Sequence, residues 1–402
     1  MTSTDNSTFD QAYYQDYTSL SWAEHWICQL DGQAGRVVRK AQFRFLPPHD
    51  GHMVFAWGLA KMDNGEIVVA GACPAIPGRL RHTVLAFSKD LGATWSDYHV
   101  VEGISSRRAS DVRPQMLVYL GNGELSFMTS WATDGPERWY SKDYGRTWPE
   151  RVKLDRAPDN QDIQCEGNSL VDRDKKGIAV RIAETGQTES NGPFPNTLSG
   201  CIRWSCDGGR SREHFDWPKQ WKWQDAYNGK TYDRGVGEGA LVRAANGWIV
   251  AALRTDNPVR FWPLHSDTFE GTAVSISKDE GKSWSPLHFV FGPGRHHANL
   301  LRLANGNLVM TVIRRLDLNN DKLQSYRRGC DAVISHDNGQ TWEVDRMYIL
   351  DEFSAIGTDV DHRHKWRRTL CGHVFSIALD DGRILTTYGN YNHVSTLILW
   401  EL

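Results

Sequence analysis

The chain has 402 residues, of which 40% are hydrophobic and 24% are charged, so its composition excludes a disordered protein and allows a large core. The formal net charge is only -3 and basic residues are mixed with acidic ones, so we expect no nucleic-acid partner. No stretch resembles a membrane span or a signal peptide. We therefore expect no membrane partner and a cytoplasmic protein as written, or a secreted or periplasmic one if a leader was removed.

Six strand-turn-strand units follow one another along the chain. Each consists of an apolar strand, a turn that ends in Gly and a second apolar strand, with alternation near period two. In chain order they are "VFAWGLAKMDNGEIVVAG", "RPQMLVYLGNGELSFMTS", "GNSLVDRDKKGIAVRIAE", "EGALVRAANGWIVAALR", "HANLLRLANGNLVMTVIRR" and "HVFSIALDDGRILTTYG". Repetition of one supersecondary unit predicts six antiparallel sheets.

A short turn motif recurs between these units. It appears as "SKDLGATW" from Ser88, "SKDYGRTW" from Ser141, "SKDEGKSW" from Ser277 and "SHDNGQTW" from Ser335, and in a decayed form as "SCDGGRSR" from Ser205. The Asp carboxylate and the hydroxyls are suited to bind the backbone of the turn, while Gly tolerates a positive φ. The Trp is suited to pack on apolar neighbours, and Arg212 takes its place in the decayed copy. The motif predicts a structural hairpin.

Sheets of this kind leave exposed edges unless they are paired, covered or closed into a ring. The repeats therefore predict an all-β fold, a six-bladed β-propeller with four-stranded antiparallel blades. We expect residues 1–402 to form one domain, with residues 1–35 as an N-terminal extension. Residues 36–46 are a candidate closing strand for the last blade, because the chain ends before that blade is complete.

The Ser-x-Asp-x-Gly-x-Thr-Trp turns resemble the Asp-box, or BNR, repeats of the sialidase (neuraminidase) superfamily. The resemblance covers nearly all of the chain after the N-terminal segment and implies a carbohydrate-active propeller. In such a ring the innermost strands converge on a central channel. Counting back from the turn glycines places ionisable residues at the starts of five of these strands, namely Arg113, Glu166, Glu238, His297 and His373. Burying five ionisable groups in one channel does not stabilise a core, so the set predicts a functional site.

The resemblance also implies roles for some residues. Glu238 and Arg254 match the separation of the inner-strand Glu and the following Arg of sialidases, and Arg327 matches a second arginine of the triad that binds the sialic acid carboxylate. The sequence departs from that pattern at three positions. The first arginine of the triad is missing, and Phe55 lies near its expected position. The following loop, "CPAIPGRLRH", contains Arg79, Arg81 and His82 but no Asp that could act as acid/base. His373 lies where sialidases have the nucleophilic Tyr. These departures argue against an ordinary sialidase mechanism.

We therefore predict an exo-acting, sialidase-like glycoside hydrolase for an acidic or decorated oligosaccharide or glycoconjugate. The catalytic candidates are Glu166, Glu238, His373 and His297, and the substrate-binding candidates are Arg113, Arg254, Arg327, His52, His82 and Trp57. Two alternatives remain open. One is a propeller lyase that cleaves next to a uronate by β-elimination, with a His base and Arg charge neutralisation. The other is a glycan-binding propeller without catalysis.

We expect no cofactor and no metal. The sequence contains neither an HExxH motif nor a zinc-like Cys/His spacing, and "DLNND" from Asp317 lacks the full pattern of a calcium-binding loop.

Overall fold

The computed structural model describes the chain except for residues 1–20, 33–34, 53, 74–79, 108–109, 130–134, 157–162, 164, 190–196, 212–213, 262–266, 320–321, 326, 355–371 and 391–393. Arg79 and Arg212 therefore lie outside the described residues. The described part of the chain is all-β, with five short 3-10 helices: η1 (Ser110–Val112), η2 (Lys219–Trp221), η3 (Val259–Phe261), η4 (Asp267–Phe269) and η5 (Val344–Arg346). Within it, no helix is both long and apolar enough to cross a membrane.

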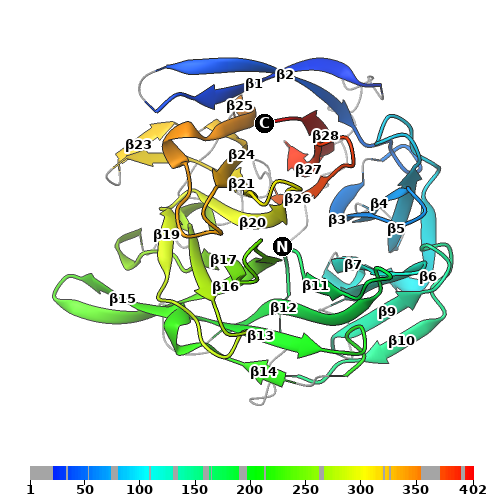
Figure 1. Ribbon diagram of the computed structural model, residues 1–402, viewed down its shortest axis with the longest axis horizontal. Helices are drawn as coiled ribbons and strands as arrows, with labels where there is room; N and C mark the ends of the chain where they lie inside the picture. The colour runs from blue at the N-terminus through cyan, green and yellow to red at the C-terminus, as the bar shows by residue number, and fades with distance from the viewer. Residues whose placement is uncertain are drawn as a thin grey trace, which may run out of the picture.

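Antiparallel sheets surround a common centre (Figure 1). The first contains β3 (Phe55–Lys61), β4 (Ile67–Ala72), β5 (Arg81–Ser88) and β6 (His99–Ser106). The second contains β7 (Gln115–Gly121), β8 (Glu124–Thr129), β9 (Glu137–Ser141) and β10 (Glu150–Lys153). The third contains β11 (Leu170–Arg173), β12 (Ala179–Glu189), β13 (Leu198–Ser205) and β14 (His214–Asp216).

The second half of the chain forms larger sheets. A five-stranded sheet contains β15 (Lys222–Tyr227), β16 (Lys230–Arg243), β17 (Ile249–Thr255), β18 (Thr272–Ser277) and β19 (His288–Phe291). A nine-stranded sheet has the spatial order β20 (Arg295–Arg302), β21 (Leu308–Arg314), β24 (Arg327–Ser335), β25 (Tyr348–Ser354), β1 (Ala23–Leu30), β2 (Arg36–Phe45), β28 (Val394–Trp400), β27 (Ile384–Asn390) and β26 (Gly372–Ala378). A small hairpin joins β22 (Asp317–Asn319) and β23 (Lys322–Ser325).

The six predicted strand-turn-strand units are confirmed as antiparallel pairs, from β3 with β4 to β26 with β27. The nine-stranded sheet differs from the prediction of separate four-stranded blades. In this sheet β2 pairs with β28, and β1 pairs with both β2 and β25, so the β1–β2 hairpin joins a group of four strands to a group of three. This pairing covers two strand edges that would otherwise be exposed. The six-blade count and the single domain over residues 1–402 stay predictions.

Apolar clusters fill the spaces between neighbouring sheets. One cluster packs β3, β4 and β5 against β7, β8 and β9, and another packs β3 and β4 against β26, β27 and β28 at the opposite end of the chain. Others lie between each remaining pair of neighbours around the ring. Because β4 and β21 lie between two such layers, all of their residues are buried, whereas the sequence pattern predicted alternation. This packing keeps the inner strands around one centre.

The repeated turns form hairpins through their own polar side chains. In the copy from Ser335, the Ser335 hydroxyl donates to Asp337 at 2.8 Å and accepts from the Gly339 amide at 2.8 Å. The same carboxylate accepts from the Thr341 amide and hydroxyl at 2.9 and 2.6 Å, and Trp342 Nε1 donates to the Gly339 carbonyl at 3.2 Å. The Ser-to-Asp and Gly-to-Ser bonds recur in all the other copies.

Replacing Asp207, in the decayed turn, with Asn tests this role of the carboxylate. Burial opposes ionisation of Asp207, but hydrogen bonds from Ser205 and Ser211 lower its pKa to about 2. Because the unfolded value is about 4, the ionised group stabilises the fold above pH ~4, and this stabilisation is lost as the pH falls toward 2. We expect Asp207→Asn to lower the free energy of unfolding by about 1 kcal/mol at pH 7. Urea unfolding at pH 7 and near pH 2 measures the difference.

The matched control for Asp207→Asn is Asp97→Asn, which replaces an exposed Asp outside the repeated turns. We expect this control to change the stability little at either pH. If Asp207→Asn lowers the free energy of unfolding by the same amount at both pH values, the role assigned to the ionised carboxylate is contradicted.

Candidate functional site

β-bulges interrupt the inner strands where the candidate residues lie. The register shifts between Val236 and Gly239 in β16, between His296 and Asn299 in β20, and between Gly372 and Val374 in β26. Glu238, His297 and His373 are the residues that these shifts release from regular pairing. A bulge re-aims a side chain, and the bulge in β20 also holds His297 in a left-handed conformation with a φ of 52°. The local backbone therefore turns these side chains toward the centre.

Glu166 reaches the same place from the segment that precedes β11. The next residue must be glycine, because Gly167 has a φ of 110° and a Cβ there would lie 2.2 Å from the carbonyl oxygen of Gly239. This close approach of two backbones brings the segment of Glu166 against the strand that carries Glu238. Glycine at Gly167 thus sets the position of both carboxylates.

The four predicted catalytic residues line one cavity, which opens to solvent. Glu166, Glu238 and His297 are buried, and the His373 side chain is 14% exposed. The structure therefore brings together residues that are up to 207 positions apart in the sequence, from Glu166 to His373. Their catalytic roles stay predictions, but their shared location is a property of the structure.

The carboxylate of Glu238 has two cationic or proton-donating partners. It forms an ion pair with Arg254, and its Oε2 lies 3.2 Å from Nδ1 of His297. The backbone amide of Glu238 donates to Gln187 Oε1 at 2.9 Å. Burial works to raise the pKa of Glu238, but the charge of Arg254 and the hydrogen bond from His297 outweigh it and hold the pKa well below its usual value. Glu238 is thus the ionised carboxylate of the cavity.

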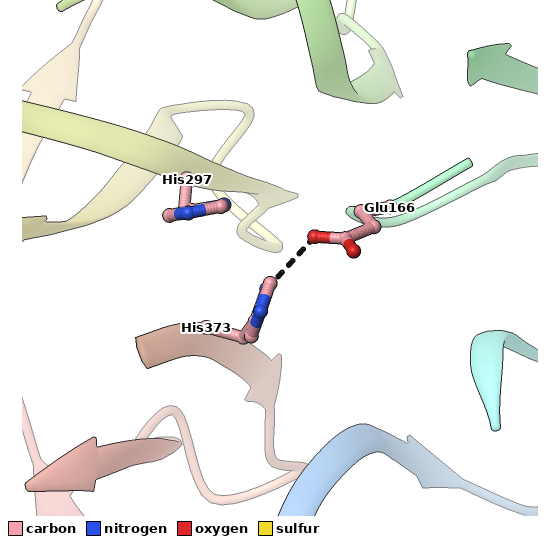
Figure 2. Close-up of side chains that lie close together, drawn as sticks. All are labelled: Glu166, His297 and His373. Atoms are coloured by element: carbon pink, nitrogen blue, oxygen red, sulfur yellow. Dashed lines mark ion pairs between the residues drawn. The ribbon is translucent and has the colours of Figure 1, made fainter. Parts of the chain in front are cut away.

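Glu166 has a different environment. Gln115 Nε2 donates to its Oε1 at 2.7 Å, and its Oε2 lies 3.2 Å from Nδ1 of His373 (Figure 2). Burial and the negative charge of Glu238 raise the pKa of Glu166 well above its usual value, against the opposing charges of Arg113 and Arg254. Two carboxyl groups in one cavity therefore differ in their preferred charge, which is the pattern of paired acid and base groups.

The imidazoles of His297 and His373 lie beside one another, with ring centroids 4.5 Å apart. Burial lowers the pKa of both, most strongly for His373, where the neighbouring His297 acts in the same direction. Both rings are therefore neutral near pH 7. The fully buried His296 lies against His297 at 4.4 Å, and burial lowers its pKa as well.

An aromatic and cationic wall adjoins His373. The Trp57 ring lies 4.0 Å from the His373 ring, and the Arg113 guanidinium lies 4.5 Å from the Trp57 ring on its face. Trp57 is also the residue released by a bulge in β3, between Ala56 and Gly58. Arg113 interacts electrostatically with Glu166 and His373, so it lies close to the cavity. Trp57 is only 4% exposed and belongs to the apolar cluster between the first two sheets, so it supports His373 and Arg113 from behind the cavity.

Three predicted substrate-binding residues make contacts with other parts of the described chain. Arg327 forms an ion pair with Glu352, and its side chain is 52% exposed. His52 makes an isolated backbone bridge with His49, and the carbonyl of His82 accepts from the Cys73 amide. Their roles in substrate binding stay predictions.

Sequence reasoning missed three residues of the site. Gln115 holds Glu166, Glu270 forms the second ion pair of Arg254, and Arg315 acts electrostatically on His297 and His373. Gln115 lies two positions after Arg113, so its place at a strand start could have revealed it. Glu270 precedes β18 and Arg315 follows β21, outside the positions that counting from the turn glycines selects.

Glu166, His297 and His373 also form the group that could hold a metal ion. Among the described residues, one ligand atom from each of the three lies within 4.8 Å of the others. Glu166 lies in the segment before β11, His297 in β20 and His373 in β26, so the three residues are far apart in the sequence and no local spacing marks them as a metal-binding group.

No family model and no curated protein matches the chain. Solved structures do match. A protein of unknown function from Dyadobacter fermentans has a TM-score of 0.59 at 18% identity, over 90% of this chain and 99% of that one. The Hadza microbial sialidase Hz136 has a TM-score of 0.58 at 15% identity, over 92% of this chain and 70% of that one. The GH93 α-L-arabinofuranosidase of Fusarium graminearum has a TM-score of 0.56 at 13% identity, over 94% and 98%. At these identities the likeness shows the fold, which is the sialidase-like fold of carbohydrate-active propellers.

Proposed function

We propose that the protein is a sialidase-like exo-glycoside hydrolase that cleaves an acidic or decorated glycan in the central cavity. The observation that carries this proposal is the pair of buried glutamates, Glu166 and Glu238, on one cavity in opposite electrostatic surroundings. The fold shared with glycoside hydrolases supports it. We further propose six blades, obtained by dividing the nine-stranded sheet at β1.

The contacts suggest a role for each glutamate. Glu166 contacts a neutral amide and a neutral imidazole and faces the charge of Glu238, so it is the proton donor to the glycosidic oxygen as the C–O bond breaks. Glu238, held ionised by Arg254, either attacks the anomeric carbon or removes a proton from the attacking water. These two routes give retention and inversion, respectively.

The substrate preference follows from the wall beside His373. Arg113 offers a positive charge to an acidic substituent, and the buried Trp57 supports its guanidinium. An acidic terminal sugar therefore fits this wall better than a neutral one. The absence of the sialidase Arg, Asp and Tyr from their usual positions favours a uronic or otherwise decorated sugar over sialic acid.

The lyase alternative is favoured by one observation. Two neutral imidazoles, His297 and His373, lie in a cavity that Arg113 adjoins, which is suited to removing the proton next to a uronate carboxylate. In that reaction the base takes the proton, a C=C bond forms and the glycosidic oxygen leaves with the bond electrons. The product would contain an unsaturated uronate and no oxygen from water.

The test is turnover of a panel of oligosaccharides ending in uronic, nonulosonic and neutral sugars, in water enriched in ¹⁸O. We expect release of a terminal sugar that carries ¹⁸O at its reducing end, without the ultraviolet absorbance of an unsaturated uronate. That absorbance would identify the lyase instead. If the protein binds glycans but turns over none of the acidic substrates, a glycan-binding propeller without catalysis is favoured and both enzymatic proposals are overturned.

A further inference from the structure

We propose that Glu166, His297 and His373 form a binding site for one divalent transition-metal ion, with Zn²⁺ and Co²⁺ as its preferred class. The three ligand atoms lie within 4.8 Å of one another, and His373 Nδ1 is 3.2 Å from Glu166 Oε2. Two atoms that bind one zinc ion, each about 2.1 Å away from it, are at most about 4.2 Å apart. The group therefore closes around an ion after side-chain shifts of less than about 1 Å.

The donor set selects the class of ion. Two imidazole nitrogens and one carboxylate oxygen suit zinc and its first-row neighbours, whereas calcium and magnesium require oxygen donors. Figure 2 shows the three side chains facing one another, His297 and His373 from strands and Glu166 from a loop. Three protein ligands leave a fourth position for water or substrate, as in reactive zinc sites.

A second contact prepares His297 as a ligand. Its Nδ1 lies 3.2 Å from Oε2 of Glu238, and Arg254 holds that carboxylate in place. A metal-binding histidine commonly donates its other ring N–H to a carboxylate, which fixes the orientation of the ring and makes the ligating nitrogen more basic. The pair of His297 and Glu238 thus presents Nε2 as the atom that binds the ion.

An independent observation points to a ligand at this position. Oε2 of Glu166 is fully buried and accepts no hydrogen bond from the residues that the structure describes, although Nδ1 of His373 lies 3.2 Å away. Of the two imidazoles beside it, His297 is buried and the His373 side chain is 14% exposed. A buried carboxylate oxygen in such a position needs either a proton or a cation. The metal site supplies the cation.

The ion and the proton on Glu166 exclude one another. The site itself does not depend on the proposed function, but one consequence rests on it. If Glu166 donates a proton during hydrolysis, an ion bound there removes the donor, so Zn²⁺ should inhibit turnover and a chelator should restore it.

The experiment titrates the full chain, treated with chelator and then dialysed, with Zn²⁺ by calorimetry and with Co²⁺ by visible absorption. We expect one ion per chain and the absorption bands of a cobalt ion with nitrogen ligands. His297→Asn and His373→Asn should each weaken binding at least tenfold, as should Glu166→Gln. His336→Asn is the matched control, because that histidine is half-exposed on a repeated turn, and it should bind as the parent does. Circular dichroism establishes that each variant is folded.

The outcomes of these experiments test the metal site and the proposed hydrolase function separately. No binding, or equal binding by parent and folded site variants, overturns the metal site. Binding that the site variants lose, in a protein that hydrolyses no glycan with or without the ion, supports the site and overturns the proposed function. Turnover that requires the ion supports the site and overturns the role of Glu166 as proton donor. Turnover that Zn²⁺ inhibits supports both.

Discussion

Replacing Glu238 with Gln is expected to lower kcat/KM by at least about a hundredfold, with most of the loss in kcat. Gln preserves the volume of the side chain and one oxygen acceptor, so Arg254 and His297 keep a partner. What the substitution removes is the negative charge needed to attack the anomeric carbon or to accept the proton of water. Steady-state kinetics on the best substrate of the oligosaccharide panel measures the loss.

The chain offers a matched control for this substitution. Glu270 is as buried as Glu238 and forms an ion pair with the same arginine, but it does not line the cavity. Glu270→Gln should therefore perturb Arg254 and the stability to a similar extent while changing kcat/KM far less. Equal losses in the two variants would mean that Glu238 acts only through the position of Arg254. Full activity in Glu238→Gln would contradict its catalytic role directly.

The strand repeats could be predicted from the sequence because their causes are local. A turn glycine, two apolar strands and the polar turn from Ser88 to Trp95 each act within a few residues, so the same signal recurs in each unit. The joining of two groups of strands by β1 could not be predicted in this way. It depends on the pairing of Cys28 with Ile349, and nothing within either segment specifies a partner so distant in sequence.

The residues of the candidate site can be divided in the same way, into those that the repeats predicted and those that they did not. Counting from the turn glycines located Glu238, His297 and His373, because a bulge at a repeated position turns each of them inward. The partners of these residues follow no repeat. Glu270 reaches Arg254 from outside the inner strands, and a metal-binding group whose members lie up to 207 positions apart has no local sequence spacing to recognise.

Arg254→Met is expected to destabilise the protein by about 3–5 kcal/mol, the largest effect on stability predicted for this site. The guanidinium lies between two buried carboxylates, Glu238 and Glu270, and the Met side chain fills a similar volume without their counter-charge. Removing one partner of a buried ion pair costs more than the pair contributes, because the remaining charge cannot reach water. Urea unfolding of the parent and the variant measures the loss.

A double substitution separates this charge effect from lost packing. In Arg254→Met/Glu270→Gln only one carboxylate lacks its partner, so the double variant should be more stable than Arg254→Met alone, although Glu270→Gln by itself should be destabilising. That reversal of sign is expected only if Arg254 acts by balancing charge. If the two losses simply add, Arg254 stabilises the site by packing, and the assignment of Glu238 as the carboxylate that Arg254 keeps ionised would lose its physical basis.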